Sequence, residues 1–204
     1  PDYETMIVSS IPGKFSVYNA LAASSVAYVE GIDKDNIVKG IEELKYVPGR
    51  SEAVEIDKPY KVIIDYAHTP DGLENILKAI RHYVKGRIIT VFGCGGDRDK
   101  TKRPIMGEIA GRLSDFVVIT SDNPRSENPL DIINQIEAGI KPTKCPYVCI
   151  ENRKDAIKHA MMLAKDSDII LLAGKGHETY QIFKDKIIDF DERVIVRELI
   201  QEGI

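Results

Sequence analysis

The chain has 204 residues, and its 28 Lys+Arg against 32 Asp+Glu give a formal net charge of −4. Because domains commonly have about 150 residues, this length allows one large domain, or one domain and a fragment of another. The acidic balance argues against a nucleic-acid or membrane-surface protein, which would carry a basic patch. The three Cys residues form no metal-type CxxC pair, so we expect a reducing, cytoplasmic location.

The chain begins Pro1-Asp2-Tyr3-Glu4, with neither an initiator Met nor the pattern of a signal peptide. We therefore expect a C-terminal piece of a longer protein. Residues 16–46 are predicted to be helical, with a first helix ending near Gly31 and a second beginning near Asp35. A helical stretch of about 45 residues is too small to be a domain, so we interpret it as the end of one.

From Ser51 onward, strand and helix patterns alternate. Five β-branched runs are predicted to be strands: 61–64, 87–92, 116–120, 147–150 and 168–173. The amphipathic helices between them begin near Thr69, Pro104, Asn128 and Asn152. Residues 181–183 and 186–190 indicate a hairpin, and Asp191 precedes a final helix. The sequence predicts an α/β fold, a doubly wound and mostly parallel sheet with a C-terminal hairpin.

In an open α/β sheet, ligands bind at the carboxyl ends of the strands. Polar or glycine-rich loops follow four of the five predicted strands, over residues 65–72, 93–99, 121–125 and 174–178. The loop after the remaining strand, Glu151-Asn152-Arg153, carries no such signal. We therefore expect four loops to form a ligand site on one rim of the sheet.

The charges of these loops are mixed, with Arg98, Arg125 and Lys175 against Asp122 and Glu178. A phosphate site would be mainly cationic. The mixture favours a zwitterion, whose carboxylate binds Arg and whose ammonium binds Asp or Glu.

Three familiar motifs are incomplete. Residues 95–101 resemble a phosphate-binding loop, but Asp99 stands where the Gly before the Lys is required. Residues 93–96 do not form the G-x-G-x-x-G of a nicotinamide site. His177 and Glu178 begin a zinc-protease pattern in which Gln181 replaces the second His, so we expect no metal site here. His68 lies on the rim, where a function and a local hydrogen bond both remain open.

Six motifs occur in order along the chain: residues 13–23, Val47-Pro48-Gly49-Arg50, residues 65–70, residues 93–99, Asp122-Asn123-Pro124-Arg125 and residues 174–178. This ordered set resembles the C-terminal part of a Mur ligase. The resemblance implies that residues 1–50 end a central ATP-binding domain. Residues 51–204 would be the Rossmann-like domain that binds the incoming amino acid.

The resemblance also implies an ATP-dependent ligase of peptidoglycan precursor synthesis. In this family ATP phosphorylates the carboxylate of UDP-MurNAc-L-Ala-D-Glu, Mg²⁺ neutralises the phosphates, and the amine of the incoming amino acid attacks the acyl phosphate. The family's UDP-binding domain, Walker-type loop and modified lysine are not found in these 204 residues. We therefore expect that the chain does not ligate by itself. We also expect a monomer that binds neither nucleic acid nor membrane.

Carried over by position, Asn19 corresponds to an adenine contact, Arg50 to an ATP contact and Asp65 to a ribose contact. The residues that match the positions for the amino acid are Arg98, Asp122, Asn123, Pro124, Arg125, Gly174 and Glu178. The Asp122–Arg125 signature accompanies meso-diaminopimelate in this family. Arg98 and Arg125 would hold its distal carboxylate and Glu178 its ammonium, so the domain would act by orientation, with no catalytic residue unless His68 is one.

Three other functions remain open. The first is an L-lysine-adding ligase of the same family, because the signature is an imperfect guide to the amino acid. The second is a folylpolyglutamate-synthase-type ligase, which shares the architecture but adds glutamate. The third is a non-catalytic ligand-binding module with a similar sheet.

Overall fold

The computed structural model describes residues 4–11 and 13–204. The chain divides into an N-terminal unit, Pro1–Val47, and a C-terminal unit, Pro48–Ile204. No helix within the described ranges is long and apolar enough to cross a membrane.

The N-terminal unit contains two helices, α1 (Lys14–Val29) and α2 (Lys34–Glu43). The side chain of Asp33 caps α2 by accepting a hydrogen bond from the backbone N–H of Asp35 at 3.0 Å. The unit buries little apolar surface of its own. Ile37 is buried, whereas Leu21 and Val26 on α1 are exposed.

A six-stranded sheet forms the centre of the C-terminal unit, in the order β1-β2-β6-β3-β4-β5. The strands are β1 (Glu52–Val54), β2 (Lys61–Asp65), β3 (Ile88–Phe92), β4 (Phe116–Ile119), β5 (Tyr147–Cys149) and β6 (Ile169–Ala173). All neighbours pair in parallel except β1, which is antiparallel to β2. The central strands β3 and β6 are buried along their whole length, as expected for apolar runs covered on both faces.

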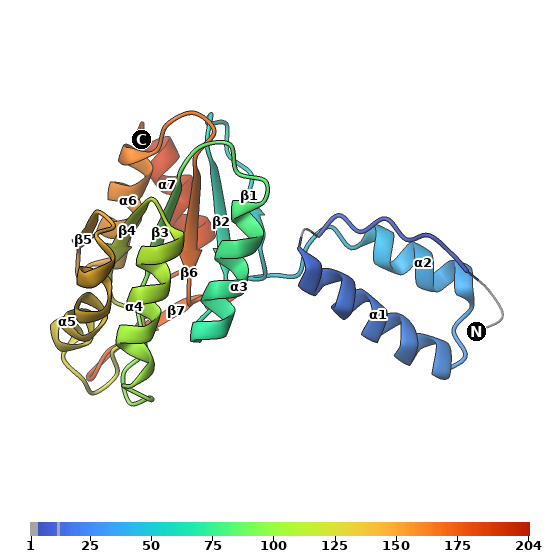
Figure 1. Ribbon diagram of the computed structural model, residues 1–204, viewed down its shortest axis with the longest axis horizontal. Helices are drawn as coiled ribbons and strands as arrows, with labels where there is room; N and C mark the ends of the chain where they lie inside the picture. The colour runs from blue at the N-terminus through green and yellow to red at the C-terminus, as the bar shows by residue number, and fades with distance from the viewer. Residues whose placement is uncertain (1–3, 12) are drawn as a thin grey trace. The chain divides into compact units, whose positions relative to one another are not determined.

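Helices cover both faces of this sheet. One face carries α3 (Pro70–Arg81), α4 (Lys102–Leu113) and α5 (Pro129–Ile140), and the other carries α6 (Arg153–Leu163) and α7 (Glu192–Gln201) (Figure 1). A 3₁₀ turn, Lys141–Thr143, follows α5. Each of α3, α5, α6 and α7 begins at a polar residue whose side chain caps its first turn.

A separate hairpin, β7 (Tyr180–Ile182) paired with β8 (Ile187–Asp189), follows β6. The α/β class, the mostly parallel sheet and the C-terminal hairpin are thereby confirmed. The prediction omitted β1, because three residues at the edge of a sheet are too short to show a periodic pattern.

Candidate functional site

The four polar loops follow β2, β3, β4 and β6, which are parallel neighbours, so their carboxyl ends meet at one edge of the sheet. The loop after β4 carries Asp122, Asn123, Pro124 and Arg125. The backbone N–H of Asn123 donates to Asp122 Oδ1 at 2.6 Å. Arg125 has a left-handed backbone, with φ 51°, and its N–H donates to the carbonyl of Ile182 at 3.1 Å.

The β7–β8 hairpin also forms hydrogen bonds with the Asp122–Arg125 loop. Gln181 of β7 is buried, and its Nε2 donates to the carbonyl of Asp122 at 2.6 Å. The backbone N–H of Ile182 donates to Asn123 Oδ1 at 3.0 Å. These bonds explain why a hairpin outside the main sheet belongs to the site.

Lys175 links the loop after β6 to the loop after β4. Its Nζ lies 3.1 Å from Glu178 Oε2 and 3.3 Å from Asn123 Oδ1. The Asn123 amide donates to the same Glu178 oxygen at 2.9 Å. Lys175 is fully buried, so its ammonium is compensated by these oxygens and by the nearby rings of Tyr180 and Phe190. One oxygen of Glu178 is thus fixed, and Oε1 accepts no hydrogen bond from any described residue.

Gly174 allows the loop after β6 to lie close to the loop after β4. Its φ is +115°, and a Cβ at this position would lie 2.8 Å from Asp122 Oδ2. A side chain there would be strained and would also displace the Asp122 carboxylate.

The glycine-rich loop after β3 packs directly on the Asp122–Arg125 loop. Gly96 donates its N–H to the carbonyl of Asn123 at 2.9 Å and accepts from Arg125 Nη1 at 2.9 Å. A Cβ on Gly96 would lie 1.9 Å from the carbonyl oxygen of Pro124, so only glycine fits.

Arg98 extends from the same loop and is exposed, with Nη1 bonded to the carbonyl of Asp97 at 2.9 Å. Arg98 and Arg125 flank Gly95, because a Cβ there would lie 3.8 Å from Arg98 Cγ and 2.9 Å from Arg125 Nη1. Two guanidinium groups therefore stand on the rim beside the loop that leads to the Glu178 network.

A second group of predicted residues lies at the end of β2. The backbone N–H groups of Ser51 and Ala67 each donate to one oxygen of the buried Asp65 carboxylate at 2.8 Å. Burial raises the pKa of Asp65, and the two amides and the Arg50 cation oppose that rise. Each oxygen keeps a lone pair, so the carboxylate can accept a further hydroxyl. The Arg50 guanidinium lies 5.0 Å from the ring centre of Tyr66.

His68 makes a local hydrogen bond, with its Nδ1 2.8 Å from the carbonyl of Tyr66, and its side chain is exposed. Asn19 lies on α1 of the N-terminal unit, where it is exposed. The functional roles predicted for both residues remain predictions.

Cys94 lies in the glycine-rich loop but has the properties of a packing residue. It is buried with its Sγ 3.7 Å from Met106 Sδ, and burial raises its pKa to about 12. A thiol with this pKa forms almost no thiolate at neutral pH, so Cys94 is not an activated nucleophile.

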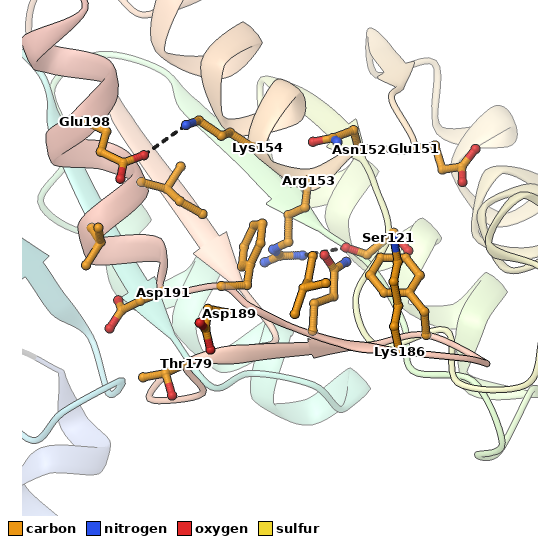
Figure 2. A pocket seen from close by; sticks show the side chains of 16 residues that line it. Ser121, Glu151, Asn152, Arg153, Lys154, Thr179, Lys186, Asp189, Asp191 and Glu198 are labelled. Atoms are coloured by element: carbon orange, nitrogen blue, oxygen red, sulfur yellow. Dashed lines mark hydrogen bonds and ion pairs between the residues drawn. The ribbon is translucent and has the colours of Figure 1, made fainter.

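Arg153 is not among the residues that the sequence motifs predict for the site. The loop in which it stands carries no sequence signal of a ligand site, yet the side chain of Arg153 is fully buried and forms an ion pair with Glu192 at 2.8 Å. Arg153 also lines a cavity of about 870 Å³, whose other lining residues include Ser121, Lys154, Gln181, Phe190 and Glu198 (Figure 2). An arginine is usually exposed, and no sequence pattern distinguishes a buried arginine at the start of a helix from an exposed one.

The described residues contain no group of three or more His, Cys, Asp or Glu side chains placed to hold a metal ion.

Residues 49–176 match the family described as Mur ligase, glutamate ligase domain. The chain is 57% identical over 202 residues to the UDP-N-acetylmuramoyl-L-alanyl-D-glutamate--2,6-diaminopimelate ligase of Caldanaerobacter subterraneus, covering 99% of this chain and 42% of that protein. A solved structure of a ligase of the same description superposes with a TM-score of 0.75 at 38% identity, covering 97% of this chain and 40% of the other. Mycobacterium tuberculosis folylpolyglutamate synthase complexed with ADP superposes with a TM-score of 0.67 at 25% identity, over 82% of this chain and 39% of the other. The chain thus spans about two fifths of the length of each protein.

Proposed function

This chain belongs to the Mur ligase family, and we propose that it supplies the amino-acid site and part of the ATP site of a peptidoglycan-precursor ligase. The reaction joins meso-diaminopimelate to UDP-MurNAc-L-Ala-D-Glu, which is bound mainly by parts of the enzyme outside these residues. In this proposal residues 1–50 end the central ATP-binding domain and residues 51–204 form the amino-acid domain.

The observation that carries the proposal is the arrangement of opposite charges around Asn123. Arg98 and Arg125 present guanidinium groups suited to a carboxylate, and Glu178 keeps one oxygen unpaired for an ammonium. The distal end of meso-diaminopimelate carries both groups on one carbon, whereas the side chain of lysine lacks the carboxylate. The two arginines therefore favour diaminopimelate over lysine.

The nucleotide fits the second group of residues. Asp65 can accept a ribose hydroxyl and Arg50 can face a phosphate. Asn19 belongs to the N-terminal unit, and its assignment to adenine is proposed from its position in the family motif alone. ATP supplies the phosphoryl group that activates the carboxylate of the other substrate, with Mg²⁺ as counter-ion, to which we assign no residue of this chain. The residues described here bind and orient the amino acid so that its free amine reaches the activated carboxylate, which is catalysis by proximity.

Isothermal titration calorimetry tests the amino-acid site directly. We expect the chain to bind meso-diaminopimelate more tightly than L-lysine or L-glutamate, because only the first carries both a carboxylate and an ammonium at its distal end: lysine lacks the distal carboxylate and glutamate lacks the distal ammonium. Arg125→Ala should weaken that binding by at least tenfold, whereas Arg112→Ala, at an exposed arginine of α4, should leave it unchanged. Preference for glutamate would favour a folylpolyglutamate-type ligase, and equal loss in both variants would contradict the assignment of Arg125.

The reaction is tested in a chimera in which this chain replaces the matching segment of the Caldanaerobacter relative. We expect the chimera to form ADP and product with meso-diaminopimelate, and the isolated chain to form neither. A chimera that folds and binds both substrates but adds only lysine would overturn the choice of substrate.

A further inference from the structure

Arg153 lies at the first turn of α6, beneath the loops that form the amino-acid site. Its side chain is fully buried and every nitrogen of its guanidinium group is engaged. Nε donates to Glu192 Oε1 at 2.8 Å, Nη2 to the carbonyl of Ala173 at 2.9 Å, and Nη1 to the carbonyl of Ser121 at 3.4 Å. Figure 2 shows the side chain of Arg153 directed toward Ser121, and both residues line the cavity.

The two carbonyls that Arg153 binds belong to different loops of the site. Ser121 directly precedes the Asp122–Arg125 loop, and Ala173 directly precedes the Gly174–Glu178 loop. Their strands, β4 and β6, are not neighbours, because β3 lies between them in the sheet. The two strands are connected only through β3, so no direct strand pairing joins the starts of the two loops. The planar guanidinium group of Arg153 bonds both of them directly.

Glu192, at the first turn of α7, holds the guanidinium group in this orientation. It is 1% exposed, its Oε1 accepts from Arg153, and its Oε2 has no hydrogen-bond partner among the described residues. A buried oxygen without a hydrogen-bond partner lowers the stability of the fold. An apolar residue at position 192 would therefore pack more favourably than glutamate if packing were the only role of this position. The charges of Lys175 and Asp122 both act on Glu192, which places the pair in the electrostatic surroundings of the site.

We propose that Arg153, oriented by Glu192, is a positioning residue that sets the spacing between the Asp122–Arg125 loop and the Gly174–Glu178 loop. This spacing fixes how far the carboxylate-binding Arg125 lies from the ammonium-binding Glu178. The inference rests on the proposed function of those two loops. It adds two residues that touch no substrate and determine which zwitterion the site accepts.

The test separates positioning from stability by using a compensated pair. Arg153→Met alone leaves Glu192 as an uncompensated buried charge and should destabilise the fold. The double variant Arg153→Met/Glu192→Leu removes both charges, and replacing a buried ion pair by apolar residues of similar volume is often neutral or stabilising. Arg153→Lys keeps a cation beside Glu192, but one ammonium cannot bridge both carbonyls in the same plane. Lys158→Met, at a partly exposed cation of the same helix, is the matched control.

We expect the double variant and Arg153→Lys to lose at least tenfold in affinity for meso-diaminopimelate by calorimetry, even where their melting temperatures approach that of the unchanged chain. The control should retain full affinity. A folded double variant or Arg153→Lys variant that binds as tightly as the unchanged chain would overturn the inference and leave the proposed function intact. Failure of the unchanged chain itself to bind would overturn the proposed function.

Hydrogen exchange gives a readout that needs no ligand. In Arg153→Lys we expect faster exchange of the amides in residues 121–125 and 174–178, while amides of the buried strand β3 stay protected. Equal protection of both loops in variant and unchanged chain would show that Arg153 does not fix them, which also overturns the inference.

Discussion

Two buried arginines support the rim of the site from the first turns of two helices on opposite faces of the sheet. Arg103 of α4 bonds the carbonyl of Gly95 at 3.1 Å and the carboxylate of Glu127 through both terminal nitrogens, at 2.9 and 3.0 Å. Arg153 of α6 bonds Glu192 and two carbonyls. Each cluster joins a glutamate to the backbone of a site loop, so the same chemistry is used twice.

The two glutamates differ because their surroundings differ. Glu127 also accepts from the backbone N–H of Asp97 at 2.7 Å and lies 3.2 Å from Lys100 Nζ, and these donors, with Arg103 first among them, lower its pKa to about 2. Glu192 is fully buried with a single donor, and burial raises its pKa. The number of donors and the access to water decide the sign of the shift, not the presence of an arginine.

The largest expected effect comes from breaking the Arg103 cluster. Arg103→Met removes every bond that the guanidinium group makes and should destabilise the protein by about 3–5 kcal/mol, because the partners of a buried ion are left unpaired. Arg112→Met, on the same helix but exposed, should change stability by less than about 0.5 kcal/mol. Urea unfolding at neutral pH measures both. Similar losses in the two variants would contradict the structural role of Arg103.

Glu127 and Glu192 should change the stability of the protein with opposite sign as the pH is lowered. The pKa of Glu127 falls from 4.5 to about 2 on folding, so its ionised form stabilises the protein above pH 4.5 and that stabilisation is lost as the pH falls toward about 2. Glu192 has the opposite sign, because a raised pKa gives stabilisation at low pH that is lost as the pH rises. We therefore expect Glu127→Gln to lower the melting temperature at pH 7 and to show a smaller further fall between pH 5 and pH 3. An unchanged acid dependence in this variant would contradict the low pKa.

The parts of the fold that could be predicted from the sequence are those with long-range regularity. The buried strands β3 and β6 are runs of five residues, all apolar except the β-branched Thr90, and α3 begins at Thr69-Pro70, so their patterns are clear. The rim could be predicted because parallel strands place their following loops together. Strand β1 could not, because its three residues gain their structure from pairing with β2.

The buried arginines could not be predicted for a different reason. Arg103 and Arg153 stand at polar helix starts, where an exposed arginine is the ordinary outcome. Their burial depends on Glu127 and Glu192, which are 24 and 39 residues away in sequence. Lys175 differs in part, because its ion-pair partner Glu178 is only three residues away in sequence, whereas its bond to Asn123 crosses 52 residues. Such distant pairs exist only once the fold has brought their elements together.

The smallest expected effect distinguishes the clusters by local opening rather than by global stability. Cys94 directly precedes Gly95, whose carbonyl Arg103 holds, and burial raises the pKa of Cys94 to about 12. Cys149, at the end of β5, is exposed and serves as an internal reference for labelling by a thiol reagent.

We expect Cys149 to react first. Arg103→Lys should speed the labelling of Cys94 several-fold, because the loop that contains Cys94 opens more often in this variant. Arg153→Lys should leave that rate unchanged, since its carbonyl partners lie after β4 and β6. Equal acceleration by the two variants, measured by mass spectrometry, would mean that the clusters act as one unit rather than as separate supports.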